Sequence, residues 1–164
     1  MLVPWLFCFC FFPVRSDGGF DSFSSPQDLR NALLRWNNTD SKLQLISRYG
    51  PLNAWNISAI RDLSRLFQDL EDFDDDIGTW DTSGVTDMSF MFAGAKSFNR
   101  PIGSWKVSRV SEMHTMFSNA ARFNQSIEAW DVAAVRDMSY MFYGAESFNR
   151  PIGSWKVSSV SDMK

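Results

Sequence analysis

The chain has 164 residues, of which 45% are hydrophobic and 21% charged, and this composition favours a globular fold over an intrinsically disordered chain. Its formal net charge of -3 is too small to attract a polyanion, and Lys and Arg occur singly, so we expect no nucleic-acid partner. Both cysteines, Cys8 and Cys10, lie in the first apolar stretch, which leaves the rest of the chain without disulfide or thiolate chemistry.

The apolar stretch at residues 2–14 is too short to span a bilayer as a helix. It is typical of a signal-peptide core with cleavage after Ser16, although no basic residue precedes it. We predict a signal peptide over residues 1–16, a secreted or cell-surface location and no transmembrane helix. The alternative is a mis-started reading frame or an uncleaved apolar tail. Three triplets are candidate glycosylation sites: Asn37, Asn56 and Asn124.

Residues 17–54 are predicted to form a linker and a helical N-terminal cap. Ser25, Pro26 and Asp28 supply an N-cap, a first-turn proline and a capping-box acid. A second helix is expected after Asp40, and Gly50 followed by Pro51 ends it. The apolar faces assigned to the two helices are Leu29, Leu33 and Trp36, and then Leu43, Ile46 and Tyr49.

From residue 55 onward the sequence repeats every 25 residues without insertion. The string SFNRPIGSWKVS occurs at 97–108 and again at 147–158, which chance does not explain. Numbering each copy from its tryptophan divides residues 55–164 into four copies and a partial fifth: 55–79, 80–104, 105–129, 130–154 and 155–164.

Within a copy, apolar residues recur at positions 6, 9, 12, 13 and 16, a spacing that predicts a short amphipathic helix. Position 8 is always acidic and would lie in the first helical turn. Position 15 holds Gly94, Asn119 and Gly144, residue types that tolerate the left-handed conformation at the end of a helix. Asp69, at the same position of the first copy, is less suited to that conformation. The second half of the copy predicts a very short parallel strand near Ile102, limited by Pro101.

One copy has too few apolar side chains to offset the entropy of ordering its backbone, so neighbouring copies must cover one another. We therefore predict an α/β repeat solenoid, similar to a leucine-rich repeat, with a short helix and a very short strand per coil and a helical hairpin as its cap.

The blocks WDTSGVTDMSFMFAGAKSFNRPIGSW and WDVAAVRDMSYMFYGAESFNRPIGSW, over residues 48–164, closely resemble the BspA-like leucine-rich-repeat surface proteins, once filed as a mycoplasma-type domain of unknown function. The resemblance implies a leucine-rich-repeat-like solenoid on secreted or surface-attached proteins that serve adhesion or protein binding. Many members of that family have no known activity.

Two rows of residues recur one copy apart. The tryptophans could stack on sugars, but their regularity favours a buried structural ladder: Trp55, Trp80, Trp105, Trp130 and Trp155. The second row is expected to bond the backbone of adjacent copies, with Asp74 in the first copy: Asn99, Asn124 and Asn149.

Catalytic and metal chemistry have little support in the sequence. His114, the single histidine, replaces the serine found at position 10 of other copies, so we interpret it as a surface substitution and not as part of a catalytic triad. The acidic stretch over residues 69–76 is a calcium candidate without EF-hand spacing, and a solvated edge is the favoured interpretation. We predict no enzyme activity, no metal and no cofactor.

The predicted contact residues are outward-facing aromatics at positions 11 and 14: Phe90, Tyr140 and Tyr143. We predict a non-enzymatic repeat module that binds an unknown protein or glycan. The alternatives are a structural repeat of a cell wall or matrix that self-associates end to end through its incomplete fifth copy, or the repeat part of a longer multidomain protein.

Overall fold

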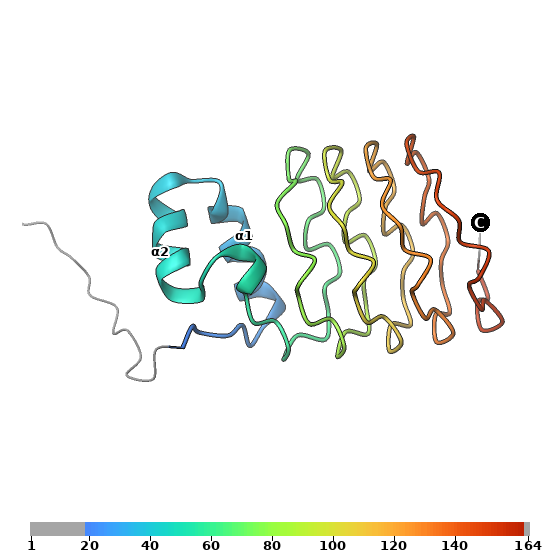
Figure 1. Cartoon of the computed structure of the whole chain (residues 1–164), viewed down its shortest axis with the longest axis horizontal. Coiled ribbons are helices and arrows are strands. Elements are labelled where there is room, and N and C mark those ends of the chain that lie inside the picture. The colour runs from blue at the N-terminus through green and yellow to red at the C-terminus, as the bar shows by residue number, and fades with distance from the viewer. Residues whose placement is uncertain (1–18, 163–164) are drawn as a thin grey trace, which may run out of the picture.

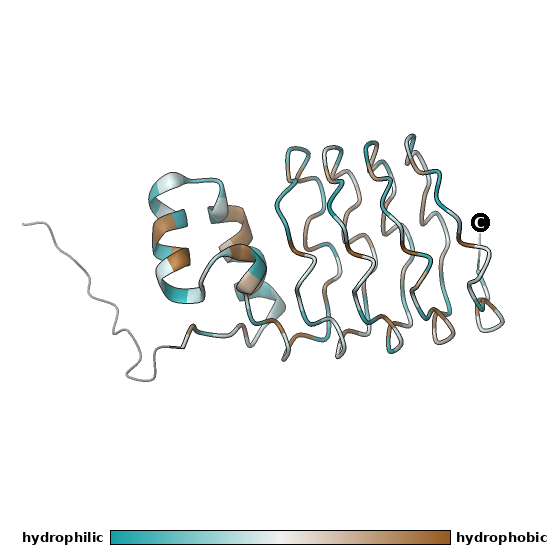
Figure 2. Cartoon of the chain, in the orientation of Figure 1, coloured by the Kyte–Doolittle hydropathy of each residue, from teal (hydrophilic) through white to brown (hydrophobic). Residues whose placement is uncertain are grey.

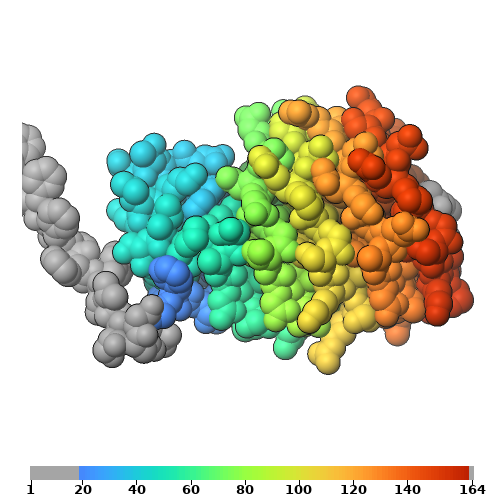
Figure 3. Space-filling model, in the orientation of Figure 1, coloured from blue at the N-terminus to red at the C-terminus, as the bar shows by residue number. Residues whose placement is uncertain are grey.

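The computed structural model describes residues 19–162, and shows two helices followed by a regular stack of loops (Figure 1). Each loop is one copy of the repeat, and we call it a layer: layers 1 to 4 are residues 55–79, 80–104, 105–129 and 130–154, and layer 5 begins at residue 155. The space-filling view shows successive layers in direct contact along the stack (Figure 3). The array is therefore one continuous body over these residues.

The helices are α1 (Pro26–Trp36) and α2 (Thr39–Tyr49), followed by a short 3-10 turn, η1 (Leu52–Ala54). The Ser25 hydroxyl accepts a hydrogen bond from the Asp28 backbone N–H at 3.1 Å, which is the predicted N-cap. Gly50, at the end of α2, has a φ of 78°. These terminal signals are local, and both helices therefore begin and end close to where the sequence predicts.

The face that α2 buries differs from the prediction. Of the predicted face, Tyr49 is half-buried against the core, but Leu43 is 67% exposed and Ile46 is 36% exposed, while Leu45 is buried instead. The helix is short, and its docking onto α1 selects a different stripe from the one that apolar spacing suggested. The prediction for α1 is confirmed, since Leu29, Leu33 and Trp36 are buried.

Helix α1 closes the first layer of the stack. Arg30 donates to the backbone carbonyls of Arg65 and Leu66, and the Trp36 indole N–H donates to Asp75 at 3.0 Å. The carbonyls equivalent to that of Leu66 in layers 2 and 3, those of Met91 and Met116, accept hydrogen bonds from Phe67 and Phe92 of the preceding layer at 2.9 Å. The arginine side chain of the helix therefore bonds the Leu66 carbonyl, which has no earlier layer to bond.

The predicted α/β solenoid is wrong, because residues 55–162 contain no helix and no strand. In layer 2 every second backbone N–H donates across to layer 3: Met88 to Glu112, Phe90 to His114, Phe92 to Met116 and Gly94 to Ser118, at 2.8–3.0 Å. Between them, other N–H groups close four-residue turns, such as Met91 N–H to the Met88 carbonyl at 3.2 Å. Successive turns place a residue toward the core every three to four positions, as a helix does. The apolar spacing therefore predicted a helix where the backbone forms turns.

Two residues in each of layers 1–4 have a left-handed backbone. The left-handed conformation predicted for position 15 is confirmed, although it ends a turn and not a helix, with φ of 60°, 73°, 56° and 68° at Asp69, Gly94, Asn119 and Gly144. Position 11 is also left-handed, with φ of 59°, 58°, 59° and 55° at Arg65, Phe90, Thr115 and Tyr140. A right-handed helix cannot pass through such residues, which is the geometric reason that none forms.

Strand-like pairing is reduced to one isolated parallel bridge per pair of layers. It lies at the acidic position 8, linking Asp62, Asp87, Glu112, Asp137 and Asp162 in succession, and not near Ile102. The sequence assigned position 8 to a first helical turn. Its side chain instead caps the loop, since Asp87 Oδ1 accepts from the Ser89 backbone N–H at 2.8 Å.

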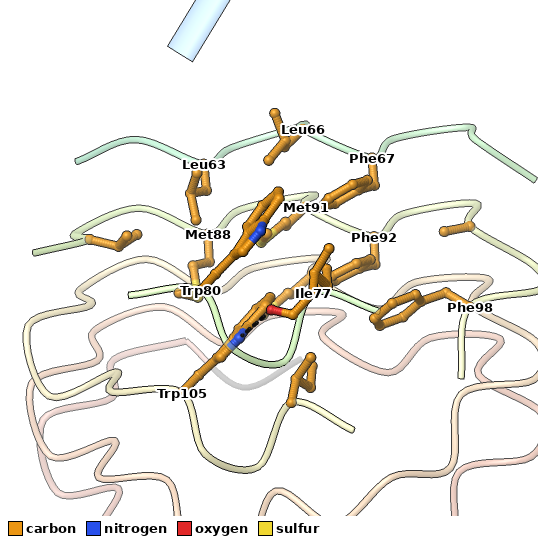
Figure 4. Close-up of a cluster of buried hydrophobic side chains, with 14 of the residues drawn as sticks. Leu63, Leu66, Phe67, Ile77, Trp80, Met88, Met91, Phe92, Phe98 and Trp105 are labelled. Carbon is orange, nitrogen blue, oxygen red and sulfur yellow. Dashed lines mark hydrogen bonds between the residues drawn. The ribbon is translucent and has the colours of Figure 1, made fainter. Parts of the chain in front are cut away.

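The core runs through the centre of the stack, and hydrophobic segments recur at matching places in successive layers (Figure 2). The stripe identified from layer 2 is buried as a set: Val85, Met88, Met91, Phe92 and Ala95, each 0% exposed. Phenylalanines stack in columns, with Phe67, Phe92, Phe117 and Phe142 at centroid spacings of 5.1, 5.5 and 5.7 Å. Figure 4 shows equivalent side chains of layers 1 and 2 lying one above the other, with Leu63 over Met88 and Phe67 over Phe92.

Candidate functional site

The tryptophan row lies inside the stack. Trp80, Trp105 and Trp130 are 3–4% exposed, and Trp155 is half-buried. The Trp105 indole N–H, at the start of layer 3, donates to the Ile77 carbonyl near the end of layer 1 at 3.2 Å (Figure 4), and Trp130 of layer 4 donates in the same way to Ile102 of layer 2 at 3.1 Å. Trp55 is 2% exposed and donates to Gly50 at 3.1 Å. Because the rings from Trp55 to Trp130 are buried and their indole donors are used, these four offer no platform for stacking on a sugar.

The asparagine row joins successive layers through side chain and backbone. Asp74 Oδ1 accepts from the Asn99 backbone N–H at 2.9 Å, Asn99 Oδ1 from Asn124 at 3.0 Å, and Asn124 Oδ1 from Asn149 at 3.1 Å. Each oxygen satisfies a donor in the next layer. The row is part of the framework, and the side chain of Asn124 is engaged in it.

The carboxylates of the acidic stretch at 69–76 bond to separate partners. Glu71 pairs with Lys96 and Asp74 with Arg100, both at 2.9 Å, while Asp75 accepts from Trp36. Asp76 Oδ1 accepts from the Gly78 backbone N–H at 3.0 Å. No three of these carboxylates converge on one point among the described residues.

The three predicted contact residues do not form one surface. Phe90 is half-buried, with the Arg65 guanidinium 4.1 Å above its ring and the His114 imidazole edge-on at 4.8 Å. Tyr140 and Tyr143 are 52% and 66% exposed and lie 6.3 Å apart in layer 4. The structure therefore brings the tyrosines together and separates them from Phe90.

The tyrosines border a groove of about 600 Å³, which we call the aromatic groove. Its lining is mainly apolar and comes from layers 4 and 5: Met138, Tyr140, Met141, Phe142, Tyr143, Ile152, Gly153, Trp155 and Val157. The sequence located the tyrosines but not the groove, because the methionines and Ile152 belong to positions that are buried in the inner layers.

A second groove, of about 680 Å³, runs over layers 1–4 and is polar. Arg61, Lys106 and Arg109 line it together with Asp131 and several serines. In the sequence these cations occur singly, and only the stacking of layers gathers them on one face. The groove is suited to hydrogen bonds and charged contacts and not to apolar docking.

A cluster that the sequence missed lies on the side of layers 3 and 4. Ligand atoms of Glu112, His114 and Asp137 lie within 4.8 Å of one another. Burial raises the pKa of Asp137, but hydrogen bonds from Ser139 and the charge of His114 lower it by more, so the pKa is below its usual value. The sequence signal for this cluster was an acid, Glu112, followed two residues later by His114 and 25 residues later by a second acid, Asp137.

Other sequence predictions fall on exposed or undescribed parts of the chain. Asn37 and Asn56 are exposed. The predicted signal peptide lies outside the described residues. Among residues 19–162, no helix has the length and apolar character needed to cross a membrane.

Comparisons with known proteins find the repeat but no characterised relative. No curated protein and no solved structure matches the chain. The family model described as Mycoplasma protein of unknown function, DUF285, matches residues 37–138 and, in a second match, residues 103–164, which together cover more than half of the chain. The chain therefore belongs to the family described as Mycoplasma protein of unknown function, DUF285.

Proposed function

We propose that this chain is a non-enzymatic repeat domain that binds a protein partner through the aromatic groove. The observation that carries the proposal is the pair of neighbouring tyrosines, 52% and 66% exposed, whose ring centroids lie 6.3 Å apart. Rigid, amphipathic tyrosines at the rim of an apolar depression are typical of residues that dominate binding energy.

The lining of the groove favours a protein over a glycan. Ile152, which is 36% exposed, offers apolar contact to side chains of a partner, whereas sugar hydroxyls require polar groups beside the aromatic face. The tryptophans, which the sequence offered as a sugar platform, are buried from Trp55 to Trp130. The partner is therefore expected to insert apolar side chains between Tyr143 and Ile152.

The proposal includes display outside the cell, for which the apolar stretch at residues 2–14 and the resemblance to BspA-like surface proteins are the support. Fractionation of the producing cells would test it. Recovery of the chain only from the cytoplasm would contradict display while leaving the groove proposal open to its own test.

Binding should depend on the tyrosines. With Tyr140→Ser and Tyr143→Ser combined, we expect the fluorescently labelled full chain to bind at least about 30-fold more weakly to the surface of cultured cells, because even one hot-spot aromatic carries about 2 kcal/mol or more. Protease treatment of the cells should abolish binding, and removal of surface glycans should not. Flow cytometry over a concentration series measures all of these effects.

The matched control is Leu34→Ser, which removes a 56% exposed apolar side chain from α1, outside the layers. It should leave binding unchanged. Equal binding by the wild type and the double tyrosine variant would overturn the proposal, and binding lost after removal of glycans alone would assign the groove to carbohydrate.

A second candidate function is structural self-association. Ile152 is 36% exposed, whereas Ile102 and Ile127 at the same position of layers 2 and 3 are 0% exposed because the next layer covers them. A second copy could cover Ile152 in the same way. Light scattering over a concentration series distinguishes the candidates: growth in mass with concentration favours self-association, and a constant monomer mass favours the binding domain.

A further inference from the structure

We propose that Glu112, His114 and Asp137 form a binding site for one zinc ion on the side of the stack. Glu112 and His114 occupy positions 8 and 10 of layer 3, and Asp137 occupies position 8 of layer 4. We call these three residues the zinc triad. The proposal is independent of partner binding, because none of the three lines the aromatic groove.

The spacing of the triad suits a shared ion. His114 Nδ1 lies 3.8 Å from Asp137 Oδ2, and one ligand atom from each residue falls within 4.8 Å of the others. Zinc bonds of about 2.0–2.2 Å in tetrahedral geometry place neighbouring ligand atoms roughly 3.4 Å apart. Small side-chain rotations, chiefly of the long Glu112, close the remaining difference.

The nitrogen of His114 that faces Asp137 has an unmet bonding need. Nδ1 is buried and has no hydrogen-bond partner, since 3.8 Å is too long for a hydrogen bond to Asp137. Buried polar atoms in native folds are nearly always satisfied, so an orphaned nitrogen beside the Asp137 carboxylate points to a missing partner. A cation that accepts its lone pair supplies that partner.

The two carboxylates differ in their hydrogen bonding. Asp137 Oδ1 accepts from the Ser139 backbone N–H at 2.8 Å, which fixes the carboxylate and leaves Oδ2 facing His114. This outer hydrogen bond is of the kind that orients metal ligands. In layers 1 and 2 the position 8 acid also caps its own loop, but Glu112 makes no such bond within residues 19–162. Its longer side chain is uncommitted.

The donor set selects the type of ion. A neutral imidazole nitrogen with two carboxylates is a ligand set that zinc accepts, whereas calcium and magnesium take oxygen ligands. The two negative charges balance the ion. His114 and Asp137 have side chains 32% and 33% exposed, which leaves a fourth position open to water or to a partner's side chain.

Zinc binding should be measured by isothermal titration calorimetry of the chelator-treated full chain with zinc chloride. We expect one saturable site per chain. His114→Ser should weaken binding at least about tenfold, because losing even an outer-shell partner of a metal site costs about 10–100-fold. Serine stands at this position in layers 1, 2 and 4, so the variant keeps the fold, and circular dichroism verifies it.

Two further variants sharpen the test. Glu112→Gln keeps the shape of the side chain and should also weaken binding, while Asp62→Asn alters the same position 8 in layer 1, which has no histidine, and should have no effect. Tetrahedral Co²⁺ absorption in the wild type, absent in His114→Ser, would support the nitrogen ligand. Equal zinc binding by the wild type, His114→Ser and Glu112→Gln, or no binding by the wild type, would overturn the proposal.

Discussion

Replacing Phe117 with alanine is expected to lower the free energy of unfolding by about 3–5 kcal/mol, the usual cost of truncating a buried phenylalanine. The ring is 0% exposed and stacks on Phe92 at 5.5 Å, Phe142 at 5.7 Å and Phe123 at 4.1 Å. The cavity would interrupt the phenylalanine column at its middle layer. Because domains of this size are stable by about 5–15 kcal/mol, this loss is a large part of the total.

Urea unfolding followed by tryptophan fluorescence measures the change. Leu43→Ala is the control, since its side chain on α2 is 67% exposed and surface truncations change stability by about 0.5 kcal/mol or less. Similar small effects for both variants would show that the column does not hold the layers together.

Replacing Gly103 with alanine is expected to destabilise the stack by about 1–3 kcal/mol, the range for overpacking a filled site. A Cβ at this residue would lie 2.6 Å from the backbone carbonyl oxygen of Ser126 in the next layer. A backbone atom cannot move aside as a flexible side chain can. The two layers would have to separate locally, which weakens the neighbouring hydrogen bonds.

Gly153→Ala is the matched control because Gly153 occupies the same position in layer 4 and a Cβ there has no heavy atom within 4 Å. Thermal unfolding monitored by circular dichroism should show a lower Tm for Gly103→Ala and little change for Gly153→Ala. Equal shifts in Tm would attribute the effect to the intrinsic properties of glycine and not to contact between layers.

The residues of the candidate sites could be predicted from the sequence only in part. Tyr140 and Tyr143 were identified as outward-facing, and they are the most exposed aromatics of the described layers. Phe90 was grouped with them because it occupies position 11 of its copy, as Tyr140 does, but Arg65 and His114 cover its ring. Whether a side chain is covered depends on residues 24 or 25 positions away, and these differ from layer to layer.

The sequence by itself determined the register of the array, the caps of α1, the buried stripe and the left-handed residue at position 15. These follow from local conformational preference and from the spacing of apolar residues. Only the tertiary structure decided that the stripe folds as turns and not as a helix. Apolar spacing specifies which side chains face the core, but it does not say whether a backbone N–H bonds within its own segment or to the next layer. Here the stacked layer offers carbonyls in register, and alternate N–H groups from Met88 to Gly94 bond to it.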